Sequence, residues 1–394
     1  MTSPDTKITK IVVVTHYFPS HGGGIERVCE QLVNKLVETN RYQISWFASD
    51  GDALPAPCKN VTFHSIASWN IIEAKLGLPY PIWSPRGYLA LWRAATNADI
   101  VHLHDYIYLG SLLGFLAAKF AAIPVMVTQH IGFIPYKSIV ARTTLEALNR
   151  TIGRYCLTNA SEVVYVSTSV GSYFAKFLRR SMATRLIPNG LDTSLFIPPT
   201  AERRRTLRAE LSTSPNQPLM LFVGRFVEKK GMRMLQQVVK ELGSHNWLFA
   251  GSGPINPTDW KLPNVQVLGS VSQTRLVDLY QAADLLVLPS KGEGFPLVVQ
   301  EAMACSTPAM VSTETALALE GISDLVIGVD VEGPESFGAW VVAIVAATSN
   351  LQELSTVGTH SADFAHRHWS WKKCAAQYDA LFSDLQHANH GPGK

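Results

Sequence analysis

Short apolar runs alternate with helical patterns along the first part of the chain. Residues 10–15 form a β-branched apolar run, and apolar residues then recur at helical spacing at Val28, Leu32 and Leu36. Four more strand-like runs follow at residues 43–47, 99–103, 124–128 and 163–167, each with polar residues and a helical pattern behind it. This alternation predicts a mostly parallel sheet that is covered by helices on both faces.

A turn-rich segment divides the pattern in two. Residues 186–196 contain Pro188-Asn189-Gly190, and Pro198-Pro199 follows soon after. Strand-like runs then begin again at residues 218–223, 247–250, 265–268 and 284–289. Because 394 residues also exceed one ordinary core, we predict two doubly wound α/β domains, over residues 1–190 and 191–370.

A glycine run, Gly22-Gly23-Gly24, separates the first predicted strand from its helix. Consecutive glycines allow a ligand to approach the backbone closely. The Gly-x-Gly-x-x-Gly spacing of dinucleotide-binding loops is absent, so a dinucleotide cofactor is not indicated. A plain strand-to-helix turn is the alternative.

A second loop, Lys291-Gly292-Glu293-Gly294, stands between an apolar run and a helix that Pro296 can open. A helix N-terminus behind a strand favours a phosphate or a sugar hydroxyl. Glu293 in the loop and Glu301 in the helix can accept hydrogen bonds from paired hydroxyls on one elongated ligand. Taken alone, a helix with one solvent-facing Glu and one helix-start Glu would explain the same pattern.

The two glutamates, with Gly-Phe after the first, resemble the signature of the retaining glycosyltransferases of family 4. The resemblance implies that Glu293 contacts the donor sugar and Glu301 the ribose of the nucleotide. It further implies that Arg225 and Lys230 hold the donor diphosphate. Cations in this position stabilise the diphosphate as it leaves. His130, at the carboxyl end of a predicted strand, resembles the family histidine that contacts the donor sugar, with a structural histidine as the alternative.

This resemblance extends over nearly the whole chain, including the helix after Trp369-Ser370-Trp371, which in this family packs back on the first domain. Residues 371–394 are therefore expected there. The residues implied in catalysis are His130, Arg225, Lys230 and Glu293. Those implied in donor binding are Gly23, Gly24, Gly224, Gly251, Val271, Gly294, Phe295, Pro296, Leu297 and Glu301.

The sequence departs from the family pattern at three places. Pro296 stands where glycine is frequent and removes one N–H donor, and Ser306 stands where glycine is usual. The glycine-rich segment expected after Ser323 is degenerate, so residues 313–335 give no clear prediction.

Two candidate metal sites are weak. Asp50-Gly51-Asp52 is an Asp-x-Asp, but Asp-Gly is a common turn dipeptide and the surrounding organisation is that of another architecture. His102 and His104 lie on one face of a predicted strand next to Asp105, without a further ligand that could be named. We expect no metal and no cofactor apart from the nucleotide-sugar substrate.

Composition narrows the class of protein. With 47% hydrophobic and 16% charged residues and a net charge of +3, the chain has the composition of a globular protein, and nucleic acid is not an expected partner. Five cysteines without a close pair suggest neither a disulfide framework nor a zinc site, which fits the cytoplasm. The longest apolar stretch, residues 108–128, is interrupted by Lys119 and Pro124, so no membrane-spanning helix is expected.

The charge is unevenly distributed. Residues 1–195 carry 18 Lys and Arg against 12 Asp and Glu, and the remainder carries 16 against 19. Basic helical segments of this kind can lie on an anionic membrane, although an ordinary solvated helix face stays an alternative. The cations are Arg142, Arg150, Arg154, Lys176, Arg179 and Arg180, with Leu145, Leu148, Tyr173, Phe174 and Phe177 beside them.

The resemblance thus implies the GT-B fold, in which two Rossmann-like domains face each other across a cleft. It implies a retaining transfer of sugar from a nucleoside-diphosphate sugar to an acceptor hydroxyl. The basic first domain favours a lipid-linked acceptor or a polysaccharide or glycolipid precursor, handled in the cytoplasm or at the inner face of a membrane. A sugar-nucleotide 2-epimerase and an inert sugar-nucleotide-binding subunit stay open, and the donor base, the sugar and the acceptor are not indicated.

Overall fold

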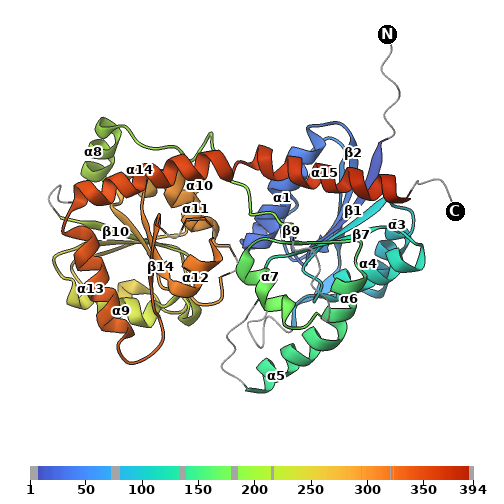
Figure 1. Cartoon of the computed structure of the whole chain (residues 1–394), viewed down its shortest axis with the longest axis horizontal. Coiled ribbons are helices and arrows are strands. Elements are labelled where there is room, and N and C mark those ends of the chain that lie inside the picture. The colour runs from blue at the N-terminus through green and yellow to red at the C-terminus, as the bar shows by residue number, and fades with distance from the viewer. Residues whose placement is uncertain are drawn as a thin grey trace, which may run out of the picture.

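Two parallel sheets, each covered by helices on both faces, lie side by side along the long axis of the molecule (Figure 1). The computed structural model describes residues 8–71, 80–132, 139–178, 185–213, 217–293, 295–319, 321–322 and 324–389. The strand order of both sheets is non-sequential, as expected when helical crossovers join parallel strands. The predicted fold class of two doubly wound α/β units is confirmed.

The first sheet has seven strands in the order β3-β2-β1-β6-β7-β8-β9, and each neighbouring pair is parallel. The five strands predicted from apolar runs are present, whereas β3 was not predicted because Thr62, His64 and Ser65 interrupt its apolar pattern. The strands are β1 Thr9–Val14, β2 Tyr42–Ser49, β3 Val61–Ile66, β6 Ile100–His104, β7 Val125–Gln129, β8 Glu162–Tyr165 and β9 Arg185–Leu186; β4 Ser68–Trp69 and β5 Ile82–Trp83 form a separate antiparallel pair.

The helices of the first domain connect these strands. Helix α1 buries the predicted stripe of Val28, Leu32 and Leu36 against the sheet. The helical segments are η1 Pro19–His21, α1 Gly24–Val37, α3 Pro85–Ala95, α4 Leu109–Phe120, α5 Ile139–Leu148, the π-helical turn η2 Asn149–Gly153, α6 Arg154–Asn159 and α7 Thr168–Ala175.

The second sheet has the order β12-β11-β10-β13-β14-β15. Its central strand β13 is a continuous apolar run with every residue buried, as expected for a parallel strand that is covered on both faces. The strands are β10 Leu219–Val223, β11 Asn246–Ala250, β12 Val265–Gly269, β13 Leu285–Leu288, β14 Ala309–Ser312 and β15 Val326–Val329. The helical segments are α8 Ala201–Glu210, η3 Glu228–Lys230, α9 Met232–Glu241, η4 Pro257–Trp260, α10 Gln273–Ala282, α11 Leu297–Ala304, α12 Thr313–Ala318, α13 Ser336–Thr348 and α14 Leu351–His368.

The chain passes between the two sheets twice, and the two crossings are hydrogen-bonded to each other. The N–H of Leu191 donates to the carbonyl of Trp369 at 2.5 Å, and the N–H of Trp371 donates to the carbonyl of Leu191 at 3.1 Å. Gly190 is required here because a Cβ would lie 2.3 Å from the Trp371 ring. After this crossing the last helix, α15 Trp371–Asn389, lies on α1 and buries Phe382 in the core of the first domain (Figure 1).

Among the described residues, no helix has both the length and the apolar character that a membrane span requires.

Candidate active site

The loops at the carboxyl ends of the strands carry the residues that the sequence singled out. In doubly wound folds this edge of the sheet binds ligands, because helix N-termini and free loop backbone meet there. Several contacts join the loop edge of one sheet to that of the other. The side-chain amide of Asn189 donates to the carbonyl of Phe295 at 3.4 Å, Leu297 packs against the core of the first domain, and α7 lies against α12.

Lys230 and Glu293 form an ion pair although 63 positions separate them in the sequence. The loop after β10 reaches the loop after β13 because Gly231 adopts a left-handed φ of +77° and passes close to Pro289, whose carbonyl oxygen would lie 2.5 Å from a Cβ at this position. This contact places the Lys230 Nζ 2.7 Å from the Glu293 Oε1, with both side chains largely buried. The structure therefore brings two of the predicted site residues into direct contact.

The charges around this pair favour an anion. Burial acts to raise the pKa of Glu293, but the ammonium groups of Lys230 and Lys229 outweigh it and hold that pKa below its usual value. Burial also lowers the pKa of Lys229, which Glu293 partly counteracts. Arg225 is exposed at the start of the same loop, and no ion pair of its guanidinium occurs within the described residues. Three cations thus share one loop with Glu228, which pairs with Arg233. The Glu293 carboxylate faces two of these cations, and Glu314 also acts on Lys229.

Two predicted glycines allow the loops after β10 and β11 to touch through their backbones. Gly224 and Gly251 adopt φ angles of +148° and +143°, which side chains rarely tolerate. A Cβ on Gly251 would lie 1.9 Å from the carbonyl oxygen of Gly224, so any side chain there would push the Arg225 loop away. Val271, in the loop after β12, is half-buried against the same core.

Glu301 lies inside α11 and is buried, with 7% of its surface exposed. The hydroxyl of Tyr280 donates to its Oε2 at 2.8 Å. Burial raises the pKa of Glu301, whereas the hydrogen bond from Tyr280 and the charge of Arg27 on α1 act to lower it. A residue of the first domain thus acts electrostatically on the carboxylate that the resemblance assigns to the donor ribose.

The residues between the two glutamates are arranged around the start of α11. Pro296 is the N-cap residue and Leu297 the first residue of the helix, so the helix begins one residue later than a proline in its first turn would give. The Phe295 ring is packed edge-on against Trp369 with the ring centroids 5.6 Å apart. Gly294 lies outside the described residues.

In the first domain, the glycine run opens α1 over a buried glutamate. Gly23 is the N-cap residue and Gly24 the first residue of the helix. A Cβ on Gly23 would lie 2.0 Å from the Glu26 Oε2, so a side chain there would displace this buried carboxylate. Glu26 pairs with His16 at 2.9 Å, and the His16 ring is stacked on Tyr108 with the centroids 4.0 Å apart.

His130 follows β7 and is almost fully buried. Its backbone N–H donates to the Asp105 Oδ1 at 2.8 Å, and its Nε2 lies 2.9 Å from the His104 Nδ1. Burial, with a smaller contribution from His16, lowers the pKa of His130 to about 3. The imidazole is therefore neutral at physiological pH and is suited to hydrogen-bond a sugar hydroxyl rather than to pair with a phosphate.

Asp105 gives a pH dependence that can be measured. Burial raises its pKa from 3.8 to about 7, against the backbone hydrogen bond from His130. Near pH 3 this carboxyl is protonated in both the folded and the unfolded chain, but between pH 4 and 7 only the unfolded chain releases the proton. The free energy of unfolding therefore falls as the pH rises through this window.

We expect Asp105→Asn, whose side-chain oxygen can still accept from His130, to raise the free energy of unfolding relative to wild type more at pH 8 than at pH 4.5. Urea unfolding at the two pH values measures this difference. Asp363→Asn, at an exposed carboxylate that pairs with Arg367, is the control and should show no such change. An equal effect of Asp105→Asn at both pH values would contradict the assignment.

The sequence did not single out several residues that complete these contacts. They are His16, Glu26, Arg27, Lys229 and Tyr280, together with Asp105, which the sequence showed only as the neighbour of His104. Lys229 stands next to Lys230 and could have been named from its position. Tyr280 lies in an ordinary helical pattern, so only the packing of α10 against α11 reveals its contact with Glu301.

The candidate metal ligands have protein partners instead. The His102 Nε2 lies 2.8 Å from the Thr128 hydroxyl, His104 contacts His130, and the Asp52 carboxylate lies 3.2 Å from the His21 Nδ1. The part of the chain that the structure describes contains no group of three or more His, Cys, Asp or Glu side chains that could hold a metal ion.

Two family models match the chain, one in each domain. The model described as Glycosyltransferase Family 4 matches residues 22–195, and the model described as Glycosyl transferases group 1 matches residues 217–347. The chain is also 29% identical over 298 residues to the D-inositol 3-phosphate glycosyltransferase of Xylanimonas cellulosilytica, a match that covers 71% of this chain and 70% of that enzyme. Matches to two further enzymes of this name cover 66% and 67% of their lengths.

Solved structures show the same fold at low sequence identity. The sucrose-phosphate synthase of Thermosynechococcus elongatus superposes with a TM-score of 0.77 at 20% identity, covering 96% of this chain and all of that one. The HepE protein of Anabaena, solved in complex with UDP and glucose, gives a TM-score of 0.71 at 16% identity, covering 95% of this chain and all of that one. These likenesses confirm the two-domain GT-B fold.

Proposed function

The chain belongs to glycosyltransferase family 4, and on that premise we propose that it moves a sugar from a nucleoside-diphosphate sugar to an acceptor hydroxyl with retention of the anomeric configuration. The observation that carries the proposal is the contact of Lys230 with Glu293 beside Lys229. This arrangement offers cations to a diphosphate and, directly next to them, a charged carboxylate to the hydroxyls of the attached sugar.

In the proposed reaction the bond between the anomeric carbon and the diphosphate oxygen breaks, and the acceptor oxygen forms the new bond on the same face. The proton of the acceptor hydroxyl passes to the departing phosphate oxygen. Arg225 and Lys230 stabilise the negative charge that develops on the diphosphate, and Lys229 adds to the local positive field. Since these cations stabilise the leaving group, the proposal requires no metal ion.

Other site residues hold the donor in place. Glu301, buried beside Tyr280, accepts hydrogen bonds from the ribose hydroxyls, and the neutral His130 contacts the donor sugar from the side of the first domain. Gly224 and Gly251 keep the loops free of side chains, so that the diphosphate can approach the backbone. The loop of Gly23 and Gly24 faces the donor phosphates and the acceptor.

For the acceptor we propose a lipid-linked saccharide or a polysaccharide or glycolipid precursor, reached from the cytoplasm at the inner face of a membrane. The excess of cations in the first half of the chain supports this choice. D-inositol 3-phosphate is a second candidate acceptor, because it is named in the relatives that match both domains. A sugar-nucleotide 2-epimerase would need no acceptor and would release a free sugar nucleotide.

A panel of UDP- and GDP-sugars separates these possibilities. The protein is incubated with each donor alone, with membrane lipid extract and with D-inositol 3-phosphate, while nucleoside diphosphate release is followed. Acceptor-dependent release with at least one donor is expected. Conversion of the donor to an epimeric sugar nucleotide, or binding without any release, would contradict the proposal.

Glu301→Ala should weaken donor binding chiefly through the nucleoside. Loss of hydrogen bonds to a buried carboxyl group costs about 1–3 kcal/mol, which corresponds to roughly 5- to 150-fold in the Kd of the bare nucleoside diphosphate. Calorimetric titration measures this loss. Asp363→Ala, at an exposed carboxylate of the second domain that pairs with Arg367, is the control and should leave the Kd unchanged. If wild type and Glu301→Ala bind the nucleoside diphosphate with equal affinity, Glu301 does not contact the ribose.

A further inference from the structure

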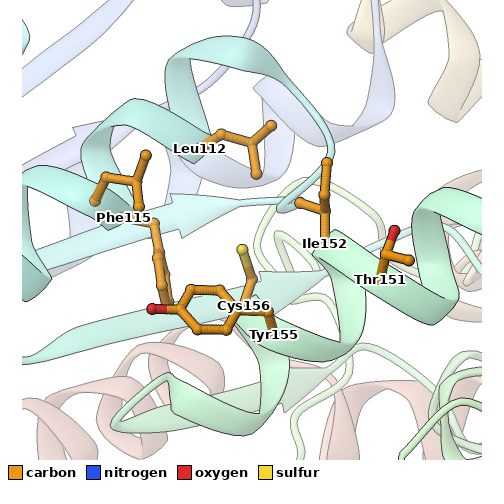
Figure 2. Close-up of a pocket in the computed structure, with 7 residues that line it drawn as sticks. Leu112, Phe115, Thr151, Ile152, Tyr155 and Cys156 are labelled. Carbon is orange, nitrogen blue, oxygen red and sulfur yellow. The ribbon is translucent and has the colours of Figure 1, made fainter.

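An apolar groove opens on the surface of the first domain, and none of its lining residues belongs to the candidate donor site. It has a volume of about 380 Å³ and lies between α4 and the segment formed by η2 and α6. Figure 2 shows Leu112 and Phe115 on one wall and Ile152 and Tyr155 on the other. The volume falls within the range of about 300–1,000 Å³ that is typical of ligand sites.

The lining of this groove excludes a charged or sugar-like ligand. Its few polar groups include Thr151, whose hydroxyl already donates to the carbonyl of Ala147 at 2.7 Å, and the thiol of Cys156. Among the described residues, no charged side chain lines the groove. A nucleotide or a saccharide would lose its hydrogen bonds to water there without replacement, whereas a hydrocarbon chain would lose none.

Exposed apolar side chains extend the groove along the surface. Leu116 is 47% exposed, Tyr155 53% and Phe120, at the end of α4, 79%. The Phe120 ring contacts Trp92 on α3 with the centroids 5.7 Å apart, so the apolar surface continues onto the neighbouring helix. A stretch of this kind, outside any site for a polar substrate, indicates an interaction surface.

The helices around the groove carry almost only positive charge. The described residues of α3, α4, α5, η2 and α6 include one acidic side chain, Glu146, which lies 3.7 Å from Arg150. Helices that combine cations with exposed apolar residues match an anionic lipid surface rather than a second copy of themselves, which their shared positive charge would repel. The cations are Arg86, Arg93, Lys119, Arg142, Arg150 and Arg154.

The apolar residues of this surface differ from those that the sequence pattern placed beside the cations. Phe174 is buried in the core, and Tyr173 and Phe177 are half-buried against it, so these aromatic residues are not freely presented to a membrane. Arg179 and Arg180 lie outside the described residues. The exposed apolar side chains at and beside the groove instead include Leu116 and Phe120 on α4 and Tyr155 on α6.

We propose that the α4–α6 face docks on an anionic phospholipid bilayer, with one acyl chain in the groove and the surrounding Arg and Lys side chains on the lipid phosphates. Docking would hold the first domain at the surface where a lipid-linked acceptor resides. The inference rests on the proposed lipid-linked acceptor, but the docking itself is independent of the donor site and is measured without a donor.

Sedimentation of the full chain with vesicles tests whether docking requires anionic lipid. One set of vesicles consists of phosphatidylcholine alone, and the other sets contain increasing fractions of phosphatidylglycerol. Binding should rise with the anionic fraction and fall with salt. Arg142→Ala combined with Arg150→Ala should lower the vesicle partition coefficient by about 25-fold, at about fivefold for each cation removed. Arg367→Ala, in an exposed ion pair with Asp363 on the second domain, is the matched control and should leave it unchanged.

The acyl-chain contact has its own test. Leu116→Ser combined with Tyr155→Ser should lower vesicle binding by at least about tenfold. Leu317→Ser combined with Val342→Ser, at positions that are 74% and 69% exposed on the second domain, should not. In Tyr155→Trp, phospholipids brominated on the acyl chain should quench the added tryptophan fluorescence, whereas phospholipids brominated on the headgroup should not.

Absence of vesicle binding, or binding that the cation and groove variants leave unchanged, would overturn the proposal. So would a concentration-dependent dimer that the groove variants dissociate, because a second copy would then cover the face. Calorimetric binding of the donor without vesicles reports on the proposed transfer site separately, so failure of one proposal is distinguishable from failure of the other.

Discussion

Lys230→Ala should lower kcat/KM for sugar transfer by about 10²–10³-fold, the effect that is typical when one donor to a developing negative charge is removed. The loss should appear mainly in kcat, because charge on the diphosphate grows as its bond to the sugar breaks. The fold should persist, since Lys229 still compensates the charge of Glu293. Arg225→Ala should act in the same direction.

The control for this prediction is Arg233→Ala. Arg233 forms an ion pair with Glu228 in the same segment of the chain but is 75% exposed, so its removal should leave kcat/KM within about twofold. Initial rates of nucleoside diphosphate release and thermal unfolding are measured on both variants. A drop in melting temperature of Lys230→Ala in step with its loss of activity would make Lys230 a structural residue.

Glu293→Ala should be comparably severe and should also act on turnover. Its carboxylate is held by Lys230 at 2.7 Å, next to the expected position of the sugar, and replacement with alanine removes both a hydrogen-bond acceptor and the compensation of two lysines. We expect kcat to fall by about 10²-fold or more, with a smaller change in the KM for the donor. Without Glu293 the loop becomes more cationic, so affinity for the bare nucleoside diphosphate should be kept or increased.

Glu293→Gln separates shape from charge in the same assay. The amide can still accept from a sugar hydroxyl, so this variant should retain more activity than Glu293→Ala. Equal activity of wild type and Glu293→Ala, or a loss that lies entirely in nucleotide affinity, would place the donor sugar elsewhere.

Local patterns were sufficient to predict the fold where a strand is buried on both faces. The all-apolar β13 and the β-branched β1 are examples, since covering by helices requires apolar side chains throughout. In contrast, β3 at the edge of the first sheet alternates with polar residues and was missed. Residues 313–335 contain α12 and β15, which were not predicted because both elements are short and the segment lacks the glycine-rich pattern of the family.

The candidate site was predictable in its residues but not in its contacts. Resemblance to the family named Lys230, Glu293 and Glu301 one by one. Lys229 could have been named from its position beside Lys230. The contact of Tyr280 with Glu301 and the approach of Gly231 to Pro289 instead depend on tertiary packing and leave no periodic signal in the sequence. Similarly, burial of Phe174 within the first domain follows from tertiary packing, which helical periodicity alone did not distinguish from exposure.

The crystal structure of the complex with the nucleoside-diphosphate sugar that the donor panel selects would test the central claim most directly. We predict that the β-phosphate oxygens lie within hydrogen-bond distance of the Lys230 Nζ and the Arg225 guanidinium. The ribose should contact Glu301 and the sugar hydroxyls Glu293. A donor bound with its diphosphate away from the loop of Arg225 and Lys230 would contradict the account.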